Sequence, residues 1–204
     1  RPESTKEALN VKKVLKKFLI KADILTWKGK KSFSNIQSLA RKKRFQLLFT
    51  KSDKFNINDI LFGHHQDDLI ENFFIRISRG SGLKGLISLS KKSKILNKNI
   101  HRPLLDQKKE DLQFVASYVF NFYVSDPSNE DEKFKRIRVR KMISQVKKEG
   151  FDKKKMMMTI QNLKYSNDAI NFYYNSNLNK NTFFSARKKT YVLNEQFFHQ
   201  PYEI

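Results

Sequence analysis

The chain has 204 residues, and 42 Lys and Arg against 20 Asp and Glu give it a formal net charge of +22. Hydrophobic residues at 39% and aromatic residues at 13% supply enough apolar surface for a core, which argues against disorder throughout. No apolar run approaches the roughly 20 residues that a membrane-spanning helix needs. The absence of cysteine excludes disulfides, thiolate metal sites and iron–sulfur clusters. We therefore expect a cytoplasmic protein without a membrane partner.

The positive charge has two explanations. Lys and Arg side chains near phosphate groups release condensed counterions, so a large excess favours a polyanionic partner. Lys outnumbers Arg by 32 to 10, however. That bias is also what an AT-rich genome produces without any binding role, so composition alone leaves both explanations open.

In the first part of the chain, apolar residues recur with the period of a helix and alternate with short β-like runs. The expected helices are residues 5–22, 34–50 and 67–78, the expected strands are residues 23–27 and 59–63, and a loop is expected over residues 28–33. Ser4 and Thr5 are the candidate N-caps of the first helix. This alternation predicts a parallel α/β sheet.

The second part of the chain has a different pattern. Residues 80–105 hold three of the six glycines and are expected to form mostly loops and short elements. We expect helices over 108–122 with Asp106 as cap, over 130–148 and over 153–178, a turn over 126–129, and a hairpin within 183–198. The run Met156–Met158 and the Phe/Tyr-rich tail are expected to pack in a core. We predict two domains, residues 1–145 and a mainly helical extension over residues 146–204.

The most informative stretch is Gly63–Asn72, which reads Gly-His-His-Gln-Asp-Asp-Leu-Ile-Glu-Asn. It follows an expected strand and opens a helix, and ligands of open α/β sheets gather at the carboxyl ends of strands. Asp68 and Glu71 share one helix face. Such a cluster can bind Mg²⁺ through oxygen atoms, or orient a nucleophile and accept its proton. Capping of the helix by Asp67 is the plain alternative, but the combination of residue types favours a functional site.

A second stretch, Arg76–Leu86, combines glycines with Arg and Lys. Backbone amides and cations of such a loop can meet phosphate. Its spacing is neither that of a Walker loop nor that of a dinucleotide fingerprint, and Gly-Ser-Gly is also a common turn.

Taken in order, these motifs resemble the tRNA(Ile)-lysidine synthetase family. The resemblance covers about residues 1–143 and rests on Gly63–Asp68 with Glu71, on Arg79–Leu86, and on four further segments: Arg1–Ser4, Asn35–Phe45, Arg102–Leu105, and Asp126–Asn129 followed by Arg136–Arg140. It implies an N-type ATP pyrophosphatase domain of the PP-loop superfamily, with a Rossmann-like parallel sheet of the adenine nucleotide alpha hydrolase type.

Two departures from the family pattern matter. The Ser-Gly-Gly-x-Asp-Ser loop that holds ATP phosphates in this family does not occur in the sequence. We therefore expect a fragment that lacks the N-terminal part of the domain and is inactive alone. Ile137 stands where the family usually has Asn, which puts that contact in doubt.

The resemblance implies an activity and a set of residues. The family uses ATP and Mg²⁺ to adenylate the C2 oxygen of the wobble cytidine in tRNA(Ile) with a CAU anticodon. The amine of free lysine then displaces AMP and forms lysidine. The implied catalytic residues are Arg44, His64, Asp68 and Glu71; the nucleotide-binding residues are Arg79, Gly80, Ser81 and Gly82; the tRNA-binding residues are Arg136, Arg138 and Arg140; and the Mg²⁺ ligands are Asp68 and Glu71. A homodimer is one option for its assembly.

Two other functions remain open at this stage. A tRNA-thiolating relative would use cysteines, and this chain has none. A non-catalytic RNA-binding fragment would keep only the basic surface, and it would be favoured if His64, Asp68 and Glu71 were scattered. For Arg44 the alternative is a surface arginine, and for the three arginines of 136–140 it is a solvated basic face.

Overall fold

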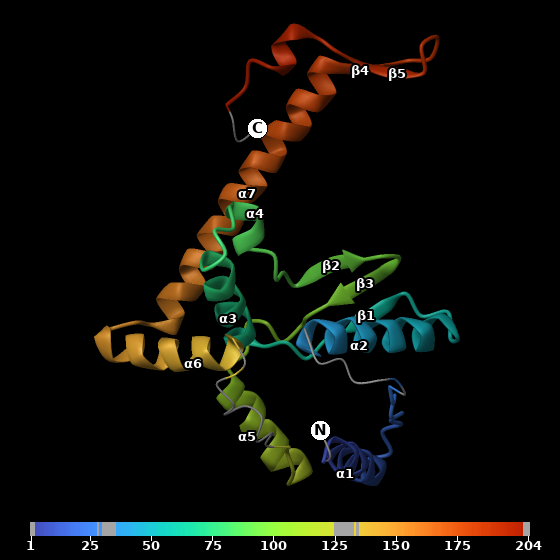
Figure 1. Ribbon diagram of the computed structural model, residues 1–204, viewed down its shortest axis with the longest axis vertical. Helices are drawn as coiled ribbons and strands as arrows, with labels where there is room; N and C mark the ends of the chain where they lie inside the picture. The colour runs from blue at the N-terminus through green and yellow to red at the C-terminus, as the bar shows by residue number, and fades with distance from the viewer. Residues whose placement is uncertain (1–2, 28, 30–35, 125–132, 134, 202–204) are drawn as a thin grey trace. The chain divides into compact units, whose positions relative to one another are not determined.

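The computed structural model describes residues 3–27, 29, 36–124, 133 and 135–201, with residues 36–38 and 147 described by their backbone alone (Figure 1). It contains two compact units that interleave along the chain. Unit 1 comprises residues 1–69 and 90–137, and unit 2 comprises residues 70–89 and 138–204. The domain boundary at residue 145 stays a prediction.

Unit 1 is built on a three-stranded sheet of β1 (Asp59–Leu61), β2 (Lys92–Ile95) and β3 (Lys98–His101), in the order β1-β3-β2. β1 runs parallel to β3, with Leu61 opposite His101. The fold is thus mixed α and β, and the expectation of parallel pairing is confirmed for this pair. β2 is antiparallel to β3, a hairpin that the sequence did not predict as such. Ile100 of β3 is fully buried and anchors the core beneath the sheet.

The helices of unit 1 are α1 (Ser4–Lys17), α2 (Ile36–Asp53) and α5 (Lys109–Phe120), together with the first turn of α3 and the start of α6. Lys98 ties the end of α2 to the sheet. Its ammonium lies 2.6 Å from a carboxylate oxygen of Asp53 and donates to the Ile57 carbonyl oxygen at 2.7 Å. These partners satisfy a charge that is almost fully buried.

The sequence expectations for two helix caps are wrong. The N-cap of α1 is Glu3, one residue before Ser4, and it makes no side-chain cap hydrogen bond. The N-cap of α5 is Lys108, while Asp106 forms an ion pair with Lys91 instead. Residue type alone did not decide where the first helical residue lies.

The strand expected over residues 23–27 is also wrong, because these residues are irregular and pair with none of the described strands. Local β propensity does not suffice without a neighbouring strand. Asp23 lies against α2 instead, with its carboxylate 2.8 Å from the Lys51 ammonium. The expected loop over 28–33, apart from Gly29, and the expected turn over 126–129 lie outside the described residues.

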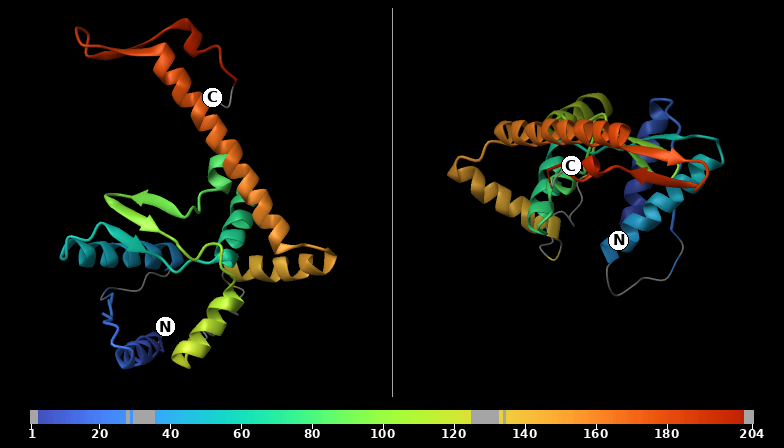
Figure 2. Two further views of the ribbon diagram at one scale, coloured as in Figure 1. Left: turned by 180° about the vertical axis from the view of Figure 1, so that it is seen from behind. Right: turned by 90° about the horizontal axis from the view of Figure 1, so that it is seen from above.

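Unit 2 contains most of α3 (Gln66–Ile77), α4 (Leu83–Leu86) and α7 (Lys153–Asn181), which continues into a hairpin of β4 (Thr182–Ser185) and β5 (Thr190–Leu193) (Figure 2). It also holds most of α6 (Lys135–Val146) and two 3-10 turns, Lys147–Glu149 and Glu195–Phe197. The helix and the hairpin expected from the sequence are confirmed.

The aromatic tail of unit 2 differs from the expectation of core packing. Phe172 and Tyr173 on α7, and Phe183 and Tyr191 on the hairpin, are exposed by more than half, and so is Met158. The buried positions of α7 are Ile160 and Asn177. Within the part of the chain that the structure describes, no helix combines the length and the apolar character needed to cross a bilayer.

Candidate active site

The site begins where β1 ends. The chain continues from β1 through residues 62–65 into α3, and two backbone hydrogen bonds fix this path. The Phe62 N–H donates to the His101 carbonyl oxygen at 2.8 Å, and the Gln66 N–H donates to the Gln107 carbonyl oxygen at 3.0 Å. The loop therefore lies at the carboxyl end of the parallel strands, where α/β folds bind ligands.

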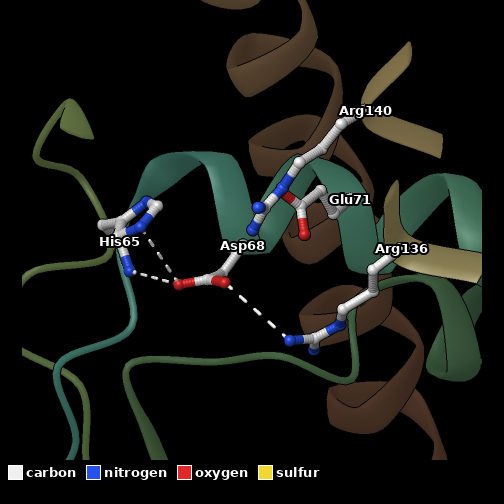
Figure 3. Close-up of polar contacts among 5 residues, drawn as sticks. All are labelled: His65, Asp68, Glu71, Arg136 and Arg140. Carbon is white, nitrogen blue, oxygen red and sulfur yellow. Dashed lines mark hydrogen bonds and ion pairs between the residues drawn. The ribbon is translucent and has the colours of Figure 1, made fainter. Parts of the chain in front are cut away.

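Asp68 caps the start of α3 (Figure 3). Its Oδ2 accepts the backbone N–H of His65 at 3.1 Å, and the His65 Nε2 lies 3.6 Å from the same oxygen. This is the back-bonding half of a capping box, with His65 as N-cap and Asp68 as the third helical residue. The other oxygen, Oδ1, lies 4.0 Å from Arg136 Nη1. The Oδ2 atom of Asp68 is thus held by the backbone at the start of the helix, and its Oδ1 atom lies at the outer limit of an ion pair with Arg136.

Glu71 lies one turn further along α3 and is 1% exposed. Its Oε1 accepts a hydrogen bond from Arg140 Nε on α6, and both residues belong to unit 2 (Figure 3). A buried carboxylate needs such a partner, because the charge has lost its water. The position implied for tRNA contact at Arg140 is therefore occupied with holding Glu71.

His64 is half-buried, and its ring packs against Phe62 with centroids 5.6 Å apart. Burial lowers the pKa of His64. The Asp68 charge raises that pKa, and the charges of Arg102, Arg136 and Arg41 lower it. The net direction is downward, so the imidazole is neutral near pH 7 and able to accept a proton.

The remaining implied residues lie apart from this group or on the surface. Arg44 is exposed on α2, and the arginine of that helix whose charge acts on His64 is Arg41. Arg138 is exposed between Arg136 and Arg140, and two residues along a helix point to different faces.

The glycine-rich segment caps the end of α3 in unit 2. Gly80, at φ +66°, donates its N–H to the Ile77 carbonyl oxygen, and the Ser81 N–H donates to the Arg76 carbonyl oxygen. This pattern is a Schellman motif, in which a left-handed residue ends the helix. Arg79, Gly80 and Gly82 are exposed. The local structure thus gives Gly80 a helix-ending role independent of any ligand.

Comparison with known proteins identifies the family. A PP-loop domain matches residues 1–147. The chain belongs to the PP-loop family.

Its relatives include tRNA(Ile)-lysidine synthases. That of Orientia tsutsugamushi (strain Boryong) is 34% identical over 178 residues, which cover 84% of this chain and 40% of the relative. That of Wolbachia pipientis wMel is 33% identical over 174 residues, covering 85% and 40%. That of Rhodopseudomonas palustris (strain ATCC BAA-98 / CGA009) is 32% identical over 157 residues, covering 77% and 45%. The chain therefore spans less than half the length of these relatives, and the family resemblance drawn from its motifs is confirmed.

Mg²⁺ does not fit the two carboxylates that the resemblance implied as its ligands. Among the described residues, no group of three or more His, Asp or Glu side chains gathers as a protein metal cage would, and Mg²⁺ bound by one or two carboxylates needs those carboxylates to be available. Glu71 is held by Arg140, and Asp68 by the His65 N–H with Arg136 nearby. Arginine beside each carboxylate also opposes a divalent cation there. We derive no catalytic step through Mg²⁺ at these residues.

Sequence reasoning gave no role to one residue of this PP-loop site. Arg102 follows β3 directly, and it is 4% exposed. Its Nη1 donates to the Ser90 carbonyl oxygen at 3.0 Å and to Ser93 Oγ at 2.8 Å. The sequence singled out the segment Arg102–Leu105 only as part of the family resemblance, and the place of Arg102 at the end of β3, beside β1, comes from the structure.

Proposed function

We propose that this chain carries part of a tRNA-modifying ligase that forms lysidine. It would join the amine of free lysine to C2 of the wobble cytidine in tRNA(Ile) with a CAU anticodon, at the expense of ATP. The names of its relatives support this proposal. The observation that carries it is local. His64 and Asp68 lie together at the carboxyl end of β1, close enough for the Asp68 charge to raise the pKa of His64.

The chemistry has two steps. The C2 oxygen of the cytidine attacks the α-phosphorus of ATP, and pyrophosphate leaves. The lysine amine then attacks C2, the C2–O bond breaks, and AMP leaves with the oxygen. The nitrogen must lose a proton as it bonds, and we assign this proton to His64, which burial keeps neutral.

Asp68 is the residue that we propose to hold the lysine ammonium. Its Oδ2 is oriented by the His65 N–H, so its geometry is set before substrate arrives. The cation that the structure places near its Oδ1, among the described residues, is the Arg136 guanidinium, 4.0 Å away. Glu71 acts differently in this proposal: buried and bonded to Arg140, it is a positioning residue within unit 2.

The other assignments stay proposals. Residues 1–145 would form an adenine nucleotide alpha hydrolase-like domain that binds ATP, with Arg79–Gly82 near its phosphates. Arg136, Arg138 and the exposed Arg44 would meet tRNA or the adenylated intermediate. A cytoplasmic location, a homodimer, a role for Mg²⁺ and the inactivity of the 204 residues alone also stay predictions, the last one checked by ATP–pyrophosphate exchange.

The test is lysidine formation by this chain joined to the remaining segments of the Orientia relative. Asp68→Asn should abolish lysine transfer while leaving adenylation of the tRNA in place. Asp111→Asn is the matched control, because Asp111 is also the third residue of its helix, α5, and is exposed. Near-normal lysidine formation by Asp68→Asn would remove Asp68 from the mechanism. Tight tRNA binding without any adenylation by the parent protein would favour the non-catalytic RNA-binding alternative.

A further inference from the structure

Asp68 is a mostly buried carboxylate whose two oxygen atoms are held to different degrees. Its side chain is 13% exposed, and its Oδ2 accepts the His65 N–H at 3.1 Å. Its Oδ1 has Arg136 Nη1 at 4.0 Å as the nearby cation among the described residues (Figure 3). Charge-assisted hydrogen bonds between such groups are about 2.7–2.9 Å long. The charge on Oδ1 is therefore only loosely compensated, although burial has removed most of its water.

The next arginine of α6 shows what a close pair looks like. Arg140, one turn after Arg136, donates its Nε hydrogen to Glu71 Oε1, and the Glu71 side chain is 2% exposed. Arg136 stays further from its carboxylate, and its own side chain is 39% exposed. An ion pair at that distance with an exposed partner contributes little to stability. The Arg136 side chain can therefore leave Asp68 at little cost to the fold.

A second cation at Oδ1 would stand close to Arg136. An ammonium group that donates to Oδ1 at about 2.8 Å lies no more than about 7 Å from a guanidinium nitrogen that is itself 4.0 Å from that oxygen. Like charges at this separation repel each other. Salt screens the repulsion weakly, because the carboxylate is mostly buried and the separation is below the Debye length of about 8–10 Å. Arg136 at its observed position therefore opposes a substrate ammonium at Asp68.

Phosphate is the partner that can draw Arg136 away. A guanidinium presents parallel N–H donors that match the oxygen atoms of a phosphate group. Arg136 is the second residue of α6, and the first turn of that helix contains no acidic residue. A charge-assisted hydrogen bond to a phosphate is also stronger than a contact at 4.0 Å. The same side chain thus has two alternative partners, the Asp68 carboxylate and an RNA phosphate.

We propose that Arg136 couples lysine binding to RNA binding. Without RNA, its guanidinium opposes the lysine ammonium at Asp68; with RNA, a phosphate group draws it away and frees Oδ1 for the amine. The inference rests on the proposed function for one point, that the ammonium is that of free lysine. Such coupling is reciprocal, so lysine strengthens RNA binding by the same factor by which RNA strengthens lysine binding. Arg136 acts through Asp68 and is a positioning residue.

The experiment measures lysine binding to the 204-residue chain by calorimetry, with and without a saturating anticodon stem-loop RNA. In the parent chain, the RNA should strengthen lysine binding about fivefold or more, which is the lower end of typical couplings. Arg136→Gln should bind lysine about fivefold more tightly than the parent when RNA is absent, and the RNA should then change its lysine affinity less than about twofold. L-norleucine, which lacks the side-chain amine, should not bind either protein.

The matched control is Lys135→Gln, which removes the neighbouring cation from the same turn of α6. It should keep the lysine affinity of the parent and its response to RNA. Arg136→Lys separates the loss of charge from a loosened structure, because it keeps a cation at this position, and it should gain less lysine affinity than Arg136→Gln. Thermal unfolding of all three variants should stay near that of the parent, since the Arg136 contact contributes little to stability.

Four results would overturn the proposal: no gain in lysine affinity in Arg136→Gln, an equal gain in Lys135→Gln, an undiminished effect of RNA in Arg136→Gln, or norleucine binding as tight as lysine binding. The proposed function fails separately. If Asp68→Asn abolishes lysine transfer but Arg136→Gln gains no lysine affinity, the reaction stands and the coupling falls. If Arg136→Gln gains lysine affinity but the joined protein forms no lysidine, the lysine site and its coupling stand without the proposed reaction.

Discussion

His64 is the residue whose protonation depends most on the surrounding fold. Its folded pKa lies below the ordinary value because burial, together with the charges of Arg102, Arg136 and Arg41, outweighs the charge of Asp68. The unfolded chain therefore binds more protons than the folded one between the two pKa values, so stability rises with pH through that window. The contribution is complete above the unfolded value of about 6.5 and is lost as pH falls toward the folded value.

The predicted rise of stability with pH can be tested by thermal unfolding between pH 7.5 and pH 5. The parent chain should lose more stability on acidification than His64→Gln, which has no proton to gain. His199→Gln is the control, because His199 is exposed and its removal should leave the pH profile of the parent unchanged. Parallel profiles for the parent and His64→Gln would contradict the assignment.

Glu71 and Arg140 form the other residue pair with a measurable consequence. Arg140→Met would leave the Glu71 charge buried and without this partner, so we expect a loss of about 2–3 kcal/mol in the free energy of unfolding. This is below the value for a fully enclosed pair because the Arg140 side chain is 35% exposed.

A double-mutant cycle with Glu71→Gln isolates the interaction. The double variant should be more stable than Arg140→Met alone, because a neutral amide tolerates this buried site better than a carboxylate that has lost Arg140. Additive losses, measured by urea unfolding, would show that the two side chains act independently. The tRNA-binding role implied for Arg140 would then regain support.

At the scale of elements, α7 depends on its first turn. The Asp152 carboxylate accepts the Lys154 N–H at 2.7 Å and satisfies one of the free donors at the start of this 29-residue helix. Asp152→Ala should cost about 1 kcal/mol of unfolding free energy. Lys108→Ala should cost less than about 0.5 kcal/mol, because Lys108 is the N-cap of α5 without a side-chain cap bond. Equal losses in urea unfolding would contradict the capping argument.

Gly80 and Gly63 differ in whether their backbone conformation requires glycine. Gly80 ends α3 at φ +66°, so Gly80→Ala should cost about 1 kcal/mol of stability wherever a ligand binds. Gly63 has open space around its Cβ position, so Gly63→Ala should leave stability within about 0.5 kcal/mol. Urea unfolding of both variants decides this, and equal losses would contradict the role of the left-handed backbone at Gly80.

The helices could be predicted from the sequence because their apolar periodicity is local, as α3 and α7 illustrate. The parallel pairing of β1 with β3 was only implied by the helix–strand alternation. The β2–β3 hairpin was missed because Lys92–Ile95 alternates lysine with small or single apolar residues and turns at Leu96, whose φ is +53° without a glycine. Neither feature is among the sequence signals that typify a hairpin.

The residues of the candidate site also fall into those that the sequence predicted and those that only the structure placed. The positions of His64 and Asp68 followed from a motif that is contiguous in sequence, and the structure brings these two together. The engagement of Arg140 by Glu71 joins residues 69 positions apart, and no local pattern signals it. The burial of Arg102 at the end of β3 depends on strand register, which the segment Arg102–Leu105 does not signal by itself. Contacts that depend on tertiary pairing are what sequence reasoning could not supply here.

At the scale of the whole molecule, the two units share helices rather than a linker. The unit boundaries after Leu69 and after Ile137 fall inside α3 and α6. Asp68 and Glu71 therefore belong to different units although they are one turn apart on α3. The same holds for Arg136 and Arg140 on α6. Each carboxylate is matched with an arginine of its own unit.

The net charge of +22 is spread over both units, because each carries more Lys and Arg than Asp and Glu. The electric field of this spread charge acts over longer distances than a single ion pair does. Affinity for tRNA should fall steeply as salt rises, since each neutralised phosphate releases counterions. Replacing Lys153, Lys154 and Lys155 with Gln should reduce the slope of log affinity against log salt by about 1 for each lysine that contacts phosphate.

Arg102→Met is expected to affect the salt dependence of tRNA binding much less than the lysine replacements do. It should change the salt slope for tRNA by no more than about 1, because it removes at most one cation. Filter binding of tRNA at several salt concentrations measures the slope for both variants. A flat salt response of the parent chain would mean that the lysine excess reflects composition alone.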